Sequence, residues 1–177
     1  MSVALPSDDL TIRLEALLFA VGRPATPVEL AAALEVPRAV VAEALPRLRE
    51  QLRTRGVRIQ EHEGEWQMSS APEAARAVER LAGLPAPQRL SPAALEALSV
   101  VAYRRPVTRA QVEAVRGVDC SGVLAGLLSR GLIEEAGRAE SPGRPILYTT
   151  SFEFLRLFGL DSLDQLPPFP EPDEPTV

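Results

Sequence analysis

The chain has 177 residues, 46% of them hydrophobic, and a formal net charge of −5 at pH 7, which suits one or two globular domains with a buried core. Its one cysteine, Cys120, excludes an internal disulfide framework and favours a reducing compartment. The sequence shows neither an apolar leader nor any run of about 18 apolar residues, so we expect a cytoplasmic protein that enters no membrane.

Residues 1–84 form the first predicted unit, which reads as three helices, two strands and a closing helix. Its first helix has a core stripe and, on the opposite side, a second apolar stripe formed by Ile12, Ala16 and Phe19. A helix with two apolar faces is usually buried on both. We therefore expect Ile12, Ala16 and Phe19 to contact a second copy of the chain. The core stripe consists of Leu10, Leu14, Leu17, Leu18 and Val21.

The second helix of this unit opens at Thr26, where Glu29 completes a capping box, because each side chain can satisfy the other's backbone N–H. The third helix spans about residues 37–55 and contains Pro46, which we expect to kink it. The two strands and the closing helix follow at 57–63, 65–70 and 72–82.

The same order recurs after a linker at 85–90, in a second unit at 91–160. The sequence RPAT at 23–26 returns as RPVT at 105–108, and Gln111 completes a second capping box with Thr108. We expect Asp119 to cap the third helix and Gly131 to end it. Two strands and a helix then follow at 132–138, 145–150 and 152–158.

Three helices followed by a two-stranded hairpin is the order of a winged helix. The predicted fold is therefore mainly α with small β wings, an α+β chain of tandem winged-helix domains at 1–84 and 91–160. The final segment, 161–177, is acidic and rich in proline, and we expect disorder after about residue 167.

No pattern in the sequence indicates catalysis. The lone histidine, His62, lies beside a hairpin turn and is expected at the surface, and Cys120 has no histidine near it. The glycines around 137–143 lie between two strands, whereas a phosphate loop joins a strand to a helix. We therefore expect no enzyme activity and no catalytic, metal-binding or cofactor-binding residues.

Winged helices commonly bind DNA, so this class is the alternative to weigh. The outward positions of the third helix at 119–130 are small and uncharged, unlike side chains that read bases. The third helix of the first unit has five arginines, but glutamates lie between them, as on a solvated helix. Residues 1–84 hold ten arginines against twelve acids, and 91–160 hold eight against seven. Without the cation excess that phosphate binding needs, protein partners are favoured over a DNA-binding transcriptional regulator.

Four motifs between Leu90 and Pro168 resemble those of the segregation and condensation protein B family, ScpB, and occur in the family's order. They are YRRPVTR at 103–109, RGV at 116–118, GRPILY at 143–148 and FLRLFGL at 154–160. The turn VDCSG at 118–122 departs from the family's usual Ser-Asp form. The first winged helix also has the expected place and size.

The resemblance implies a non-enzymatic accessory subunit of the bacterial SMC condensin-like complex, acting in chromosome condensation and segregation during cell division. Members of the family form homodimers, chiefly through the first winged helix, and bind the kleisin ScpA. ScpA bridges the heads of the SMC ATPase, so the chain would meet SMC only through ScpA. It would lie at the nucleoid and contact DNA at most weakly and without sequence preference.

We expect the kleisin to contact the second unit. On the helix at 92–104, Leu95 falls on the predicted core stripe, whereas Val100 and Tyr103 fall outside it and could meet a partner helix. Packing of Tyr103 against the following turn is an equal alternative. Pairing of Arg116 within its own domain is slightly favoured over pairing with a carboxylate of the partner. The kleisin-binding candidates are Val100, Tyr103, Arg104, Arg116, Arg138 and Arg144.

Overall fold

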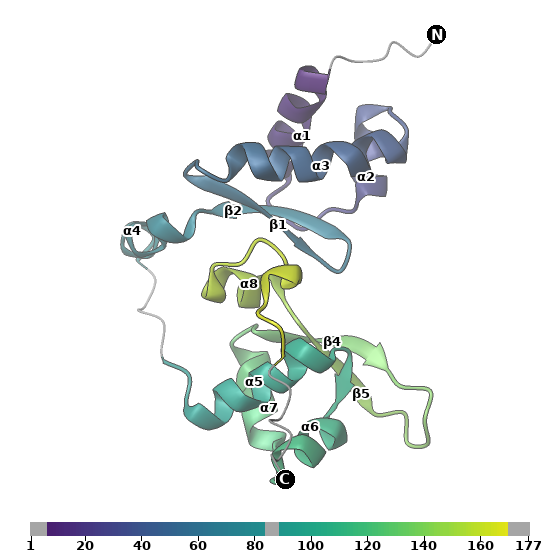
Figure 1. Ribbon diagram of the computed structural model, residues 1–177, viewed down its shortest axis with the longest axis vertical. Coiled ribbons are helices and arrows are strands. Elements are labelled where there is room, and N and C mark those ends of the chain that lie inside the picture. The colour runs from purple at the N-terminus through teal and green to yellow at the C-terminus, as the bar shows by residue number, and fades with distance from the viewer. Residues whose placement is uncertain (1–6, 84–88, 170–177) are drawn as a thin grey trace, which may run out of the picture. The chain divides into compact units, whose positions relative to one another are not determined.

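The computed structural model describes residues 7–83 and 89–169 (Figure 1). The described residues form two compact units, one within 1–87 and 155–162 and the other within 88–154 and 163–177. Both are mainly helical with a small antiparallel sheet, which confirms the predicted fold class. Most of the predicted linker at 85–90, and the tail beyond residue 169, lie outside the described residues.

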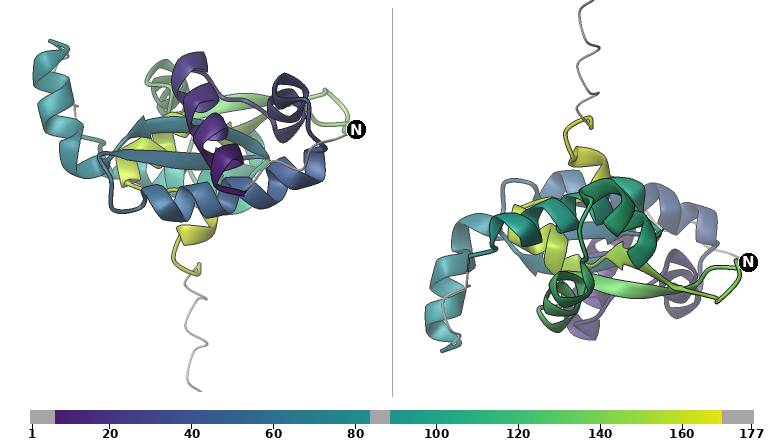
Figure 2. Two further views of the ribbon diagram at one scale, coloured as in Figure 1. Left: turned by 90° about the horizontal axis from the view of Figure 1, so that it is seen from above. Right: turned by 90° about the horizontal axis from the view of Figure 1, so that it is seen from below.

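The first unit packs three helices against a two-stranded hairpin. In Figures 1 and 2, α1 crosses over the hairpin and lies beside α3, and α2 packs against α3. The elements are α1 (Ser7–Val21), α2 (Pro27–Leu34), α3 (Arg38–Leu52), β1 (Val57–His62), β2 (Glu65–Ser70), the 3-10 turn Pro72–Ala74 and α4 (Ala75–Leu81). The second half of α8 (Phe152–Phe158) also belongs to this unit.

Leucines spaced by one helical turn form the face of α1 that is buried in the core. Leu14 and Leu18 are 0% and 1% exposed, and they share a cluster with Val41, Leu45 and Ile59 from α3 and β1. Burial of each such side chain favours folding by about 1.5–3 kcal/mol. The core of the first unit is thus built by the periodicity that predicted the helix.

Three details of the first unit differ from the sequence-based expectations. Val21 is 43% exposed, because α1 ends there and the chain turns at Gly22 with a φ of 63°. The third helix ends at Leu52, about one turn earlier than predicted. His62, expected at the surface, is only 3% exposed, and it lies on the same side of β1 as the buried Gln60, opposite the core residue Ile59.

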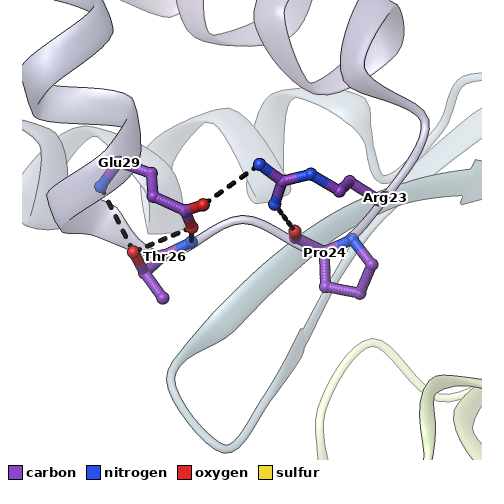
Figure 3. A network of polar contacts seen from close by, with 4 residues as sticks. All are labelled: Arg23, Pro24, Thr26 and Glu29. Atoms are coloured by element: carbon purple, nitrogen blue, oxygen red, sulfur yellow. Dashed lines mark hydrogen bonds and ion pairs between the residues drawn. The ribbon is translucent and has the colours of Figure 1, made fainter.

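The entry into α2 is fixed by the predicted capping box (Figure 3). The Glu29 backbone N–H donates to Thr26 Oγ1 at 3.2 Å, and the Thr26 N–H donates to Glu29 Oε2 at 2.8 Å. Arg23 Nη2 adds a bond to Glu29 Oε1 at 3.1 Å. These bonds, with the Thr26 backbone N–H the strongest cause, hold the pKa of the Glu29 carboxyl below its ordinary value.

The outer edge of β1 is closed by residues from the far end of the chain. The backbone N–H of Glu61 donates to the Asp161 carbonyl oxygen at 2.8 Å, and Glu61 forms a parallel bridge with Ser162. Gln60 Nε2 donates to the Leu160 carbonyl oxygen at 2.7 Å. Because the other edge of β1 pairs with β2, the strand has partners on both sides.

The second unit repeats this design around a three-stranded sheet in the order β3-β5-β4. The second capping box is present, with Gln111 N–H donating to Thr108 Oγ1 at 3.3 Å and Thr108 N–H donating to Gln111 Oε1 at 2.8 Å. Its elements are α5 (Pro92–Arg104), β3 (Val107–Thr108), α6 (Arg109–Arg116), α7 (Ser121–Ser129), β4 (Ile133–Arg138) and β5 (Ile146–Thr150).

The buried surface of α5 corrects two predictions. Val100 is only 8% exposed, whereas Leu95, predicted in the core, is 42% exposed. The helix contacts α6, α7 and β5, so it is covered over more of its circumference than a single stripe. Val100 therefore belongs to the interior of the folded chain, and its prediction as a partner-binding residue is wrong.

The ends of α7 give one correction and one confirmation. Asp119 does not cap the helix: its Oδ2 accepts a hydrogen bond from Ser121 Oγ at 2.7 Å, and Cys120 stands at the cap position without a side-chain bond. Gly131 ends the helix as predicted, with a φ of 65°. Its N–H bonds to the Leu128 carbonyl and the next N–H bonds to the Leu127 carbonyl, which is the Schellman pattern.

Candidate partner-binding surfaces

The second apolar stripe of α1 is open to solvent. Phe19 is 76% exposed and Ile12 is 64% exposed, and Ala16 is exposed between them. Ala20, also exposed, extends the stripe by one position that the sequence analysis did not include. A contiguous exposed apolar patch is unusual on a solitary domain and is typical of a protein interface. Its use as a contact between two copies remains a prediction.

Tyr103, at the end of α5, meets the start of the C-terminal tail. Its hydroxyl donates to the Pro167 carbonyl oxygen at 2.7 Å. Its ring lies edge to face with that of Phe169, with centroids 5.1 Å apart and planes at 70°. The start of the tail is thus a neighbour of Tyr103, and packing of Tyr103 against the turn that follows α5 stays a prediction.

Arg116 is engaged within the second unit. Its side chain is 9% exposed, Nη2 donates to Glu96 Oε2 at 2.9 Å, and Nη1 donates to the Sγ of buried Cys120 at 3.4 Å. The bond to Glu96 is the main cause that raises the pKa of Arg116. The structure therefore favours the internal role of Arg116 over the role of partner ligand.

The remaining candidate arginines are open to solvent. Arg104 lies at the exposed end of α5, beside Tyr103 in the chain. Arg138 ends β4 and Arg144 lies in the turn before β5, where Arg138 Nη1 donates to the Arg144 carbonyl oxygen at 3.0 Å. Both wing side chains are exposed, so their guanidinium groups are available to a carboxylate of a partner. Their binding role stays a prediction.

The outward face of α7 is small and flat. Ser121, Gly122, Ala125 and Ser129 are exposed, whereas Leu124 and Leu127 point into the core. A methyl group added at Gly126 would meet no atom within 4 Å. Such a face lacks the long polar side chains that reach base edges in a DNA groove.

The arginines of α3 do not form a uniform cationic surface. Arg49 lies over the ring of Trp66 at 5.5 Å, a cation–π contact that draws it toward the hairpin. Arg53, just past the end of α3, pairs with Glu50 of the helix at 3.5 Å. The exposed Arg38 and Arg47 are left to face solvent. This mixture fits the amphipathic, solvated helix that the sequence predicts.

Across residues 7–83 and 89–169, no group of three or more His, Cys, Asp or Glu side chains is placed to hold a metal ion. In the same part of the chain, no helix is long and apolar enough to cross a membrane.

Sequence reasoning missed Pro167 and Phe169 as neighbours of Tyr103. The signal that could have found Phe169 is an aromatic residue between prolines in an otherwise polar tail.

Comparison with known proteins identifies the family. The model of the family described as "Segregation and condensation complex subunit ScpB" matches residues 12–169. "Segregation and condensation protein B" of Moorella thermoacetica is 48% identical over 164 residues, which are 92% of this chain and 84% of the relative.

Two solved structures are also similar. The ScpB structure from Mycobacterium tuberculosis is 41% identical, with a TM-score of 0.43, and the match covers 89% of this chain and 99% of the other. The structure described as a dimer of the ScpB N-terminal domain complexed with ScpA peptide is 26% identical, with a TM-score of 0.39, over 42% of this chain and 95% of the other. With the family model matched over most of its length, this chain belongs to the ScpB family of segregation and condensation complex subunits.

Proposed function

We propose that this chain acts as a non-enzymatic assembly subunit of the SMC condensin-like complex at the nucleoid. It forms a homodimer through α1 and captures the kleisin ScpA, which links it to the SMC ATPase. The observation that carries the proposal is the exposed apolar stripe of Ile12, Ala16 and Phe19 on a chain that belongs to the ScpB family.

The charge distribution supports polypeptide partners. The net charge of the chain is −5, and the outward face of α7, where a winged helix would read DNA, is small and uncharged. A protein that neutralises several phosphates needs clustered cations, and its affinity falls steeply with salt. We therefore place the contacts on apolar and mixed surfaces, with Tyr103, Arg104, Arg138 and Arg144 as the kleisin-binding residues.

The test is co-purification of the full chain with ScpA, followed by measurement of the mass of the complex by light scattering. We expect a stable complex that holds two copies of this chain. A parallel titration with duplex DNA addresses the DNA-binding regulator. Sequence-selective binding with a steep salt dependence, together with no capture of ScpA, would refute the proposal.

A further inference from the structure

The tail segment at 166–169 sits on the Tyr103 side of α5 in the manner of a bound peptide. It combines a side-chain hydrogen bond to a backbone carbonyl, from Tyr103 to Pro167, with an edge-to-face ring contact to Phe169. Surfaces that recognise proline-rich segments also hold an extended backbone against aromatic side chains. Pro167 and Pro168 favour extended backbone, which presents the carbonyl and the ring without a helix or a strand.

The contact is weak enough to be exchanged. Phe169 remains 50% exposed, and among the described residues the tail from Pro167 onward has no other hydrogen bond. One edge-to-face pair changes an equilibrium constant by about two- to tenfold. A competing segment with a similar carbonyl and ring therefore needs only modest affinity to replace the tail.

Charge indicates what kind of segment fits. Arg104 is exposed next to Tyr103, and the tail that follows Phe169 contains Glu171, Asp173 and Glu174. An exposed arginine at the same end of α5 favours a segment that carries carboxylates after its aromatic residue. The chain's own tail has this composition.

We propose that the Tyr103 face of α5 is a docking site for an extended segment in which an aromatic residue is followed by carboxylates, and that residues 166–169 of this chain occupy the site in cis until the kleisin displaces them. Its second half rests on the proposed function, since the kleisin is the displacing partner. A tethered competitor raises the apparent dissociation constant of the partner, which equals the intrinsic constant divided by the fraction of molecules whose site is empty.

The first test compares ScpA affinity of the full wild-type chain, Phe169→Ala and Leu95→Ala by calorimetry. Phe169→Ala should bind ScpA about two- to tenfold more tightly because the cis contact is weakened. Leu95→Ala removes an exposed apolar side chain from the same helix, about 12 Å away, and should leave the affinity unchanged. Unchanged or weaker binding by Phe169→Ala overturns cis competition.

The second test needs no kleisin. A peptide of residues 161–177 should bind the Phe169→Ala chain, and the same peptide carrying Phe169→Ala should bind less well. If ScpA binds no variant, the proposed function fails, while peptide binding still supports the docking site. No difference between the two peptides overturns the site. A loss of self-association in Phe169→Ala would place the segment on a second copy and refute its position in cis.

Discussion

Replacement of Phe19 by alanine tests whether the exposed face of α1 joins two copies of the chain. Phe19 is 76% exposed, and full burial of a phenylalanine contributes about 1.5–3 kcal/mol. Burial of the exposed part alone is worth about 1.1–2.3 kcal/mol, and a two-fold dimer buries it twice. The dissociation constant of the dimer should therefore rise by a factor of about 40 to 2,000.

Sedimentation equilibrium over a range of concentrations measures this change directly. The matched control is Leu81→Ala on α4, which removes an apolar side chain that is 92% exposed in the same unit. The control should leave the dissociation constant unchanged, whereas Phe19→Glu should yield a monomer with an unaltered circular dichroism spectrum. If Phe19→Ala and Phe19→Glu both keep the wild-type mass, the α1 face is not the contact between copies.

Four further substitutions probe the stability of the fold and the first capping box. Leu14→Ala should lower the free energy of unfolding of the first unit by about 2–5 kcal/mol in urea, since Leu14 is fully buried. A decrease below about 1 kcal/mol would contradict the described core. Gly131→Ala should lower the free energy of unfolding by about 1–2 kcal/mol because φ is 65° there. Gly126→Ala, in open space inside α7, should raise it by about 0.5–1 kcal/mol. Equal effects of the two substitutions would refute the assigned end of α7. The lowered pKa of Glu29 stabilises the folded chain at pH values above the ordinary carboxyl pKa of 4.5, and this stabilisation is lost as the pH falls through the lowered value. Glu29→Gln should therefore make the urea midpoint depend less on pH on the acid side. An unchanged pH dependence would exclude this role of Glu29.

Local signals in the sequence predicted much of the fold. The two Thr-x-x-Glu/Gln pairs form capping boxes because the bonds they need lie within four residues of chain. Gly131 ends α7 for a similarly local reason, since glycine enters the left-handed region without steric cost. The duplicated RPxT step marks the start of the second helix in each unit.

Contacts between residues that are distant in the chain could not be predicted from such local signals. Tyr103 and Pro167 are 64 residues apart, and no periodicity links the end of a helix to a proline-rich tail. A single apolar stripe predicts Val100 outside the core, but three elements cover α5 and bury this side chain. Asp119 precedes α7, yet the cap position falls one residue later, at Cys120, and the Asp119 carboxylate accepts a bond from the Ser121 side chain. Tertiary packing decides these positions.

The closure of β1 by residues 160–162 ties the completion of the first unit to the order of synthesis. Gln60 and its partner Leu160 are 100 residues apart, so a ribosome adding about 5–20 residues per second needs roughly 5–20 s between them. During that interval the nascent hairpin carries an unpaired outer edge, the kind of edge on which neighbouring chains can pair wrongly. Arg58 and Glu61 place charges on this strand, and charged side chains on an edge strand oppose its pairing with other chains.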